Sequence, residues 1–324
     1  MKSAARVECA LALLLASAGA AAQTGVRAEK PLIQPTSPIL SAPSETDWSV
    51  AAGVTVARDN DINRLLTNSV VSSNARVPDT IVHSALDLSA TPRWGDALRV
   101  DADYSFDRYD FQSHTAFSYY ENSLSLDAYP RVKGRWSLDL GGGLDWVGDS
   151  GGAVSNSRTG RLGVLWEGPG RLRAKGGVEY ANDSVPVDAQ RDDVSRAVYL
   201  SLMRPLPRGQ YGFFGYRFSS LSAAGPNYSR REHSLYAGLI QHWSERLGAT
   251  WLVSYTARSY ANEDTRFLTK RRDDVYTFVF KPSVKLWSGV RLVGKTLFQR
   301  ADSNVSTKGY DDQVYSLGVE AFYD

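Results

Sequence analysis

The chain has 324 residues, with 37 lysines and arginines against 35 aspartates and glutamates, so its formal net charge is +2. So small an excess of positive charge argues against nucleic acid as a partner. The mean hydropathy is −0.31, and beyond the N-terminal segment no apolar run reaches the ~18 residues that a membrane helix needs. A secreted soluble protein fits this composition, and so does a transmembrane β-barrel, in which only alternate residues face lipid.

The first residues have the pattern of a secretory signal peptide. Lys2 and Arg6 precede an apolar stretch at 11–16, and the alanines at 20–22 offer a cleavage site before Gln23. We therefore expect residues 1–22 to be removed, which leaves a mature chain of net charge +1. The single cysteine, Cys9, falls within this segment, so neither disulfides nor thiolate metal sites are expected afterwards.

Residues 23–46 carry four prolines among small and polar residues, which predicts a flexible periplasmic tail. From residue 47 to residue 324 the chain is punctuated by six short polar turns, centred near residues 94, 134, 169, 208, 245 and 288. Between neighbouring turns lie two alternating segments joined by a polar loop of about ten residues, and the first loop, 59–79, is the longest. This repeat is typical of an antiparallel β-meander.

The segments between the turns alternate strictly between apolar and polar residues, as in Trp136–Trp146. They run for 10 to 13 residues, longer than ordinary strands of about 5–6 and close to the roughly 9–11 of a tilted transmembrane strand. With terminal strands at 48–58 and 310–323, the count is fourteen. We predict an all-β fold: a single closed antiparallel transmembrane β-barrel in the outer membrane of a Gram-negative bacterium, with short periplasmic turns and both termini periplasmic.

Six of the eight tryptophans lie at or beside the tight-turn end of their segments: Trp48, Trp94, Trp136, Trp166, Trp243 and Trp287. Indole rings favour the membrane–water boundary, so this clustering predicts an aromatic girdle. The alternative is that these rings form the core of a soluble β-sandwich.

The charged residues on the face opposite the apolar one are segregated along the chain. Acidic residues dominate the third to fifth strands: Asp101, Asp103, Asp107, Glu121, Asp127, Asp139 and Asp145. Basic residues dominate the eleventh to thirteenth: Arg258, Lys281, Lys285, Arg291 and Lys295. In an up-and-down barrel these two arcs lie across the lumen and create a transverse field that orients polar solutes. The alternative is that the charges pair locally or are simply solvated.

A basic residue followed by acidic ones recurs where descending strands begin. The members are Arg191 and Asp193, then Arg231 with Glu232, then Arg272 and Asp273, and Asp311 lies at the same place in the last strand. These residues predict a rim of guanidinium–carboxylate pairs, or a site for divalent cations or lipopolysaccharide phosphates. The alternative is that they are polar residues flanking loops.

No catalytic motif is present, since the sequence contains neither H-E-x-x-H, G-x-S-x-G nor a phosphate-binding loop. We therefore expect no enzymatic activity, no cofactor and no bound metal.

The C-terminal third resembles a known family. Arg272-Asp273 opening a strand, Ser303-Asn304 after the next one, and the closing segment 314–319 are similar to the barrel domain of surface lipoprotein assembly modifiers. The resemblance implies a fourteen-stranded outer-membrane barrel that serves the export of lipoproteins or soluble cargo. A helical tetratricopeptide-type domain usually precedes that barrel, whereas here the proline-rich tail occupies its place.

Three functions follow from these observations. The first is a porin-like channel for passive passage of small hydrophilic solutes. The second is a barrel for export or assembly of surface lipoproteins, with a secreted lipoprotein as cargo, and the third is a structural or adhesive protein. The partners expected in every case are membrane lipid, lipopolysaccharide and the outer-membrane assembly machinery.

Overall fold

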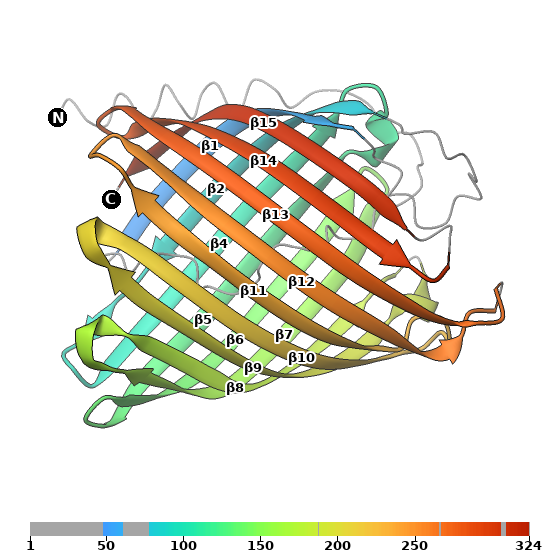
Figure 1. Ribbon diagram of the computed structural model, residues 1–324, viewed down its shortest axis with the longest axis horizontal. Helices are drawn as coiled ribbons and strands as arrows, with labels where there is room; N and C mark the ends of the chain where they lie inside the picture. The colour runs from blue at the N-terminus through green and yellow to red at the C-terminus, as the bar shows by residue number, and fades with distance from the viewer. Residues whose placement is uncertain (1–47, 61–77, 187, 266, 306–308, 324) are drawn as a thin grey trace.

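The computed structural model describes residues 48–60, 78–186, 188–265, 267–305 and 309–323. The predicted signal peptide at 1–22, the predicted tail at 23–46 and most of the first loop at 59–79 lie outside the described residues. Within them, no helix has the length and the hydropathy that crossing a membrane requires. The described chain is built from long strands joined by turns and single 3-10 turns (Figure 1).

Fourteen long strands and one two-residue strand form one antiparallel sheet that closes on itself. Their bounds are β1 Trp48–Asp59, β2 Asp79–Ala90, β3 Arg93–Trp94, β4 Leu98–Phe111, β5 Tyr119–Lys133, β6 Trp136–Asp149, β7 Gly152–Glu167, β8 Arg173–Ser184, β9 Asp193–Leu206, β10 Gln210–Ala223, β11 Arg230–His242, β12 Leu247–Glu263, β13 Lys270–Trp287, β14 Val290–Ser303 and β15 Tyr310–Tyr323.

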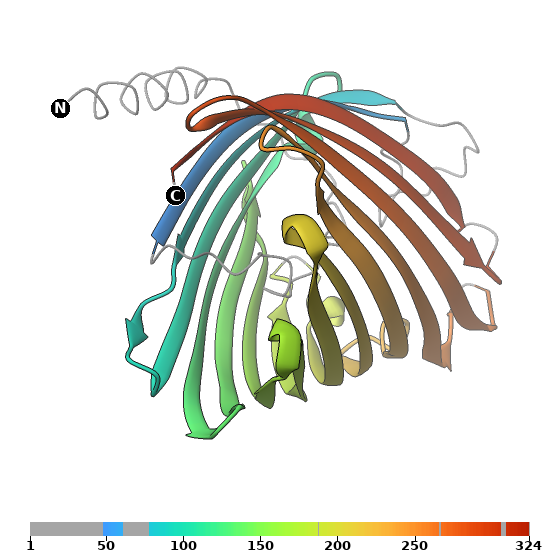
Figure 2. The same ribbon diagram turned by 60° about the vertical axis from the view of Figure 1, so that its left-hand side comes forward.

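Each strand pairs with its neighbours in sequence, and β1 pairs with β15 to close the ring. The short β3 lies in the turn between β2 and β4, which pair with each other directly. The predicted fold, a closed up-and-down barrel of fourteen strands, is therefore confirmed. Figure 2 shows the first and last strands side by side where the barrel closes.

Alternation of residue type explains why these segments form the wall of a barrel. On β6, Leu138, Leu140 and Leu144 are exposed, whereas the alternating residues Ser137 and Asp139 are buried. Successive side chains of a strand point to opposite faces, so the apolar set covers the outside and the polar set points inward. The outward apolar side chains are exposed on every side of the barrel, among them Val54, Leu88, Leu126, Leu162, Val198, Leu235, Tyr276 and Leu317.

All six predicted turns join consecutive long strands at one end of the barrel, here called the tight-turn end. Five of them contain a glycine with φ between 56° and 77°, at positions 95, 134, 170, 209 and 289. This left-handed conformation is the one that tight turns need and that glycine adopts at no steric cost. The sixth turn is closed by the Ser244 hydroxyl, which accepts hydrogen bonds from the backbone N–H groups of Arg246 and Leu247 at 3.2 and 3.0 Å.

Two expectations need correction at the opposite end, called the loop end. The long strands have 12 to 18 residues rather than 10 to 13, and the connections after β4, β6, β8, β10, β12 and β14 have two to eight residues rather than about ten. The cause is that backbone pairing continues beyond the apolar stretch, because the polar residues there still bond to the neighbouring strand. The barrel therefore extends past its apolar band at the loop end.

Two clusters of apolar side chains point into the barrel, which alternation alone did not predict. The first joins Ala57, Ile81, Phe111, Tyr119, Val147 and Val154 near the loop ends of β1 to β7. The second joins Phe213, Leu252 and Val279 on β10, β12 and β13. Part of the interior is thus packed by side chains rather than lined by charges.

Candidate functional site

The inner wall of the barrel is the candidate functional site, and the register places both predicted charge arcs on it. The seven acidic residues lie on β4, β5 and β6, and the five basic residues lie on β12, β13 and β14. In the fourteen-strand ring these groups are centred on β5 and β13, eight strands apart one way and six the other. They therefore occupy roughly opposite sides of the lumen.

Many acidic side chains have partners beside them on the same wall. Arg161 on β7 donates from one Nη to both carboxylate oxygens of Asp127 at 2.6 and 2.8 Å. The Asp127 side chain is 0% exposed and that of Arg161 is 9% exposed. Asp139, also fully buried, lies 3.0 Å from the Lys175 ammonium and accepts a hydrogen bond from the Tyr199 hydroxyl at 2.6 Å.

The other members of the acidic arc contact smaller or weaker partners. Asp101 lies 3.2 Å from Arg99, and Asp107 lies 2.7 Å from the His83 ring. Serine hydroxyls donate to Asp103 and Asp145. Glu121 is buried. The acidic arc is therefore neutralised in part by local pairing.

Three cations that pair with or border this arc were missed from the sequence: Arg161, Arg173 and Lys175. They lie on β7 and β8, just beyond the strands in which acidic residues dominate. Their positions along the strands could have revealed them. Arg161 lies two residues before Gly163 and Lys175 two residues before Gly177, so they fall on the same inward face of the sheet as these glycines.

Inward-facing glycines make room for these buried pairs. A Cβ on Gly141 would stand 1.9 Å from an Asp127 carboxylate oxygen, and one on Gly163 would stand 2.8 Å from the Tyr199 hydroxyl. A Cβ on Gly177 would stand 2.4 Å from the Leu162 carbonyl oxygen. Asp127 and Tyr199 therefore lie flat against the backbone of β6, β7 and β8.

The basic arc divides into paired arginines and water-exposed lysines. Arg258 is buried and lies 3.1 Å from Glu232, and Arg291 pairs with Glu320. Lys281, Lys285 and Lys295 are exposed although their positions point inward. On β13 the preceding inward residues, from Asp273 to Val279, are buried. The lumen is therefore open to water beside these lysines, toward the tight-turn end.

An acidic residue outside the two predicted arcs completes this open region. Asp87 on β2 is exposed and lies within electrostatic range of Lys281, and also of Asp107 and Glu320. β2 and β13 are separated by β1, β15 and β14 in the ring. The open part of the lumen thus brings charges of both signs from separated strands into one electrostatic environment.

The rim residues pair differently from their order in the sequence. Arg231 and Arg272 point outward and are exposed, whereas Glu232 and Asp273 point inward. Residues next to each other on a strand face opposite sides, so the pairs form at a spacing of two. Arg230 pairs with Glu232, and Arg271 lies 2.7 Å from Asp273.

The remaining rim residues do not form a continuous ring of pairs. The Arg191 guanidinium lies over the Tyr228 ring at 5.8 Å. Asp193 is in register with Asp183, another carboxylate. Asp311 is exposed and lies 4.0 Å from Arg300.

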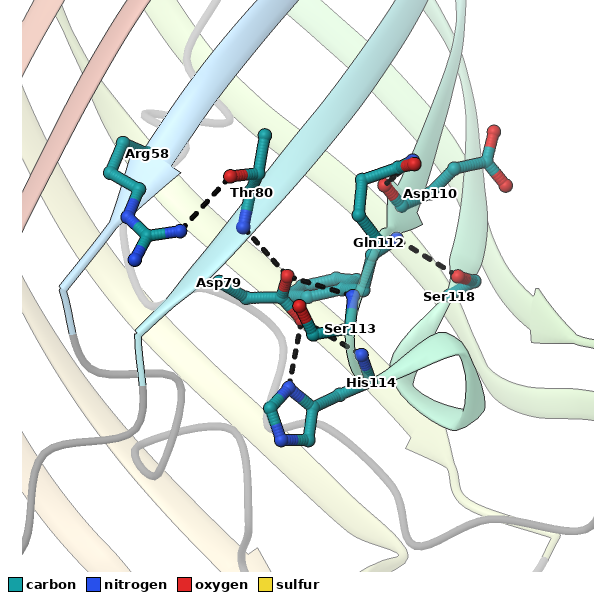
Figure 3. A network of polar contacts seen from close by, with 9 residues as sticks. Arg58, Asp79, Thr80, Asp110, Gln112, Ser113, His114 and Ser118 are labelled. Atoms are coloured by element: carbon teal, nitrogen blue, oxygen red, sulfur yellow. Dashed lines mark hydrogen bonds and ion pairs between the residues drawn. The ribbon is translucent and has the colours of Figure 1, made fainter.

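A buried carboxylate fixes the connection between β4 and β5 (Figure 3). Asp79, at the start of β2, accepts hydrogen bonds from the backbone N–H groups of Thr80, Ser113 and His114 at 2.6, 3.0 and 3.0 Å. Its second oxygen also lies 2.9 Å from the His114 ring. These contacts tie the loop after β4 to the neighbouring strand.

The six tryptophans predicted to form a girdle lie at strand ends or turns of the tight-turn end. Five are exposed: Trp48, Trp94, Trp136, Trp243 and Trp287. Trp166 packs against Trp136, with ring centroids 6.2 Å apart. In the part of the chain that the structure describes, no three His, Cys, Asp or Glu side chains are grouped so that they could hold a metal ion.

Comparisons with known proteins agree with this architecture. The DcaP outer membrane channel of Acinetobacter baumannii is 10% identical, and the match covers 85% of this chain and 97% of that one with a TM-score of 0.51. An anion-selective porin from Comamonas acidovorans is 10% identical over 85% of this chain and 98% of its own, with a TM-score of 0.48. An outer membrane channel from Pseudomonas putida F1 is 8% identical over 85% of this chain and 95% of its own, with a TM-score of 0.45.

At 10% identity, the likeness to the DcaP channel shows a shared fold alone. A comparison with curated protein sequences gives no match. The family model for the surface lipoprotein assembly modifier matches residues 169–320, which extends the resemblance seen in the last third of the sequence back to the turn before β8. The chain is an outer-membrane-type β-barrel whose strands β8 to β15 are similar to surface lipoprotein assembly modifiers.

Proposed function

We propose that this barrel lies in the outer membrane, with the tight turns and both chain ends toward the periplasm, and passes small hydrophilic solutes passively. The outward apolar side chains support a membrane location, because so extensive an apolar surface is not stable in water. The orientation follows the general arrangement of bacterial barrels, in which periplasmic turns are short.

The observation that carries the channel proposal is the exposure of inward-pointing lysines. Lys281 and Lys285 continue the inward face of β13 and yet are accessible to water. Side chains that fill a closed lumen are buried, so their exposure requires open space inside the wall. Barrels of ~8 strands are filled by side chains and those of ~16–18 enclose aqueous channels, and fourteen strands fall between.

The exposed lysines also give the proposed path a preference for anions. In the open region three exposed lysines, Lys281, Lys285 and Lys295, outnumber the one exposed acid described there, Asp87. Charges lining a narrow path raise the local concentration of counter-ions, so anions are favoured over cations of similar size.

Planar-bilayer recordings of the purified full chain test this proposal. We expect ion conductance with a reversal potential that indicates anion preference, shifted toward cations in the double variant Lys281→Glu, Lys285→Glu. The matched control is Arg196→Glu, Arg231→Glu, which makes the same charge change on the outward face and is expected to leave the reversal potential unchanged. Absence of conductance at every voltage would remove the channel function.

The family match favours a second function, export or assembly of surface lipoproteins. Residues 169–320 carry this match, and a lipoprotein cargo would be the partner. A deletion strain is then expected to lose at least one surface-exposed lipoprotein, measured by protease shaving and mass spectrometry. An unchanged surface proteome would contradict export and would leave the channel proposal intact.

A further inference from the structure

Three arginines face outward near the loop ends of alternate strands: Arg158 on β7, Arg196 on β9 and Arg231 on β11. All three are exposed. Arg158 is in register with the outward Leu144, and Arg196 with the outward Tyr180, which fixes the direction of their side chains. We call these three residues the outer-wall arginines.

The outer-wall arginines share one height on the barrel. They lie nine, ten and eleven residues from the tight-turn ends of their strands at Glu167, Leu206 and His242. Ten residues at ~3.3 Å each, in a strand tilted by about 40°, climb about 25 Å, which is the height of the apolar band of a transmembrane barrel. The three guanidinium groups therefore stand where hydrocarbon gives way to headgroups.

None of these guanidinium groups has a hydrogen-bond or ion-pair partner among the residues that the structure describes. Arg196 and Arg231 are both in register with Ser220, so two strand spacings, about 10 Å, separate them. Arg108 and Arg300 differ from these three arginines, because they pair with Asp110 and Asp302 respectively. The outer-wall arginines thus form a concentrated positive patch without internal compensation.

An apolar groove of about 750 Å³ lies against the same strands. Its outward lining includes Leu162, Val178, Val198 and Phe218, and Arg196 borders it. The space exists partly because Gly160 carries no side chain, and a Cβ built there meets no atom within 4 Å. An apolar groove bordered by Arg196, which shares the register partner Ser220 with Arg231, matches a lipid with an anionic headgroup.

We propose that this surface binds lipopolysaccharide, with acyl chains in the groove beside Gly160 and headgroup phosphates on Arg196 and Arg231, flanked by Arg158. Guanidinium groups bind phosphate through short, charge-assisted and often bidentate hydrogen bonds, and the Ser220 hydroxyl between the two arginines supplies a further donor. Lipopolysaccharide carries several phosphates on one headgroup, so each arginine can bind a phosphate of its own, whereas a phospholipid offers a single phosphate to both. The proposal rests on the orientation given above, with the loop end toward the outer leaflet.

Binding of purified lipopolysaccharide to the detergent-solubilised full chain, compared with phosphatidylglycerol and with enzymatically dephosphorylated lipopolysaccharide, tests the proposal. We expect lipopolysaccharide to bind at least tenfold more tightly than either other lipid. The variant Arg196→Gln, Arg231→Gln should lose at least tenfold in affinity. The matched control is Arg204→Gln, which removes an exposed outward arginine from the tight-turn end of the same strand and should change nothing.

Gly160→Leu is the second variant, since it fills the groove and leaves every arginine in place, and a Cβ at this position meets no atom within 4 Å. It should weaken lipopolysaccharide binding severalfold, and retention of the heat-modifiable gel shift checks that each variant is folded. Equal binding of phosphatidylglycerol, or unchanged affinity in both the arginine variant and Gly160→Leu, would overturn the proposal. Conductance does not depend on this surface, so the two proposals fail separately.

Discussion

Removing Arg161 should destabilise the barrel strongly, because it leaves a buried carboxylate without its cation. The Asp127 side chain has no exposure to water, and its two oxygens both accept hydrogen bonds from Arg161. Breaking a buried pair by removing one partner costs about 3–5 kcal/mol. We therefore expect Arg161→Met to lower the free energy of unfolding by about that amount.

A neighbouring ion pair provides the matched control. Arg217 donates to Glu179 at the same distance, 2.6 Å, but the two side chains are 35% and 18% exposed. Water can solvate the Glu179 carboxylate that remains after Arg217 is replaced, so Arg217→Met is expected to lower the free energy of unfolding by only about 0–1 kcal/mol. The two variants remove the same chemical group and differ in burial.

Urea unfolding of the barrel in lipid vesicles, followed by tryptophan fluorescence, measures both free energies by linear extrapolation. Replacing both buried partners, in Asp127→Leu with Arg161→Met, should recover most of the loss, because apolar groups of similar volume leave no uncompensated charge. The reasoning is refuted if Arg161→Met costs no more than Arg217→Met, or if the double variant is as unstable as Arg161→Met alone.

Further outcomes follow from close approach and from loop contacts. Gly177→Val should lower the free energy of unfolding by about 1–3 kcal/mol or block folding, because its Cβ would stand 2.4 Å from a backbone oxygen. Urea midpoints measure this loss, and the control is Gly160→Ala, where no atom lies within 4 Å of the added Cβ. Asp79→Ala should release the 112–118 loop, so limited proteolysis should cut there faster while cleavage at 264–269 is unchanged. Equal cleavage rates in the variant and the parent chain would contradict the anchoring role of Asp79.

The strand number, the turns and the inward or outward direction of each side chain follow from the sequence, because a period of two and glycine-containing turns are local properties. Pairing between side chains is not local. It depends on the register of adjacent strands, which brings Arg161 beside Asp127 and Lys175 beside Asp139, residues 34 and 36 positions apart. The predicted pairing of adjacent rim residues failed for a related reason, since Arg272 and Asp273 are neighbours in sequence but face opposite sides of the wall.

The unequal distribution of burial decides which charges act on a solute. On β5 to β8, Asp127 and Asp139 are buried against glycine-lined backbone and neutralised by Arg161 and Lys175. An acid that is paired and shielded from water contributes little field to the lumen, so the acidic arc is weaker than its seven residues suggest. The opposite wall keeps three exposed lysines. An electric field across the lumen therefore arises mainly from the basic side, and charge reversal there should change ion selectivity more than neutralisation of the buried acids.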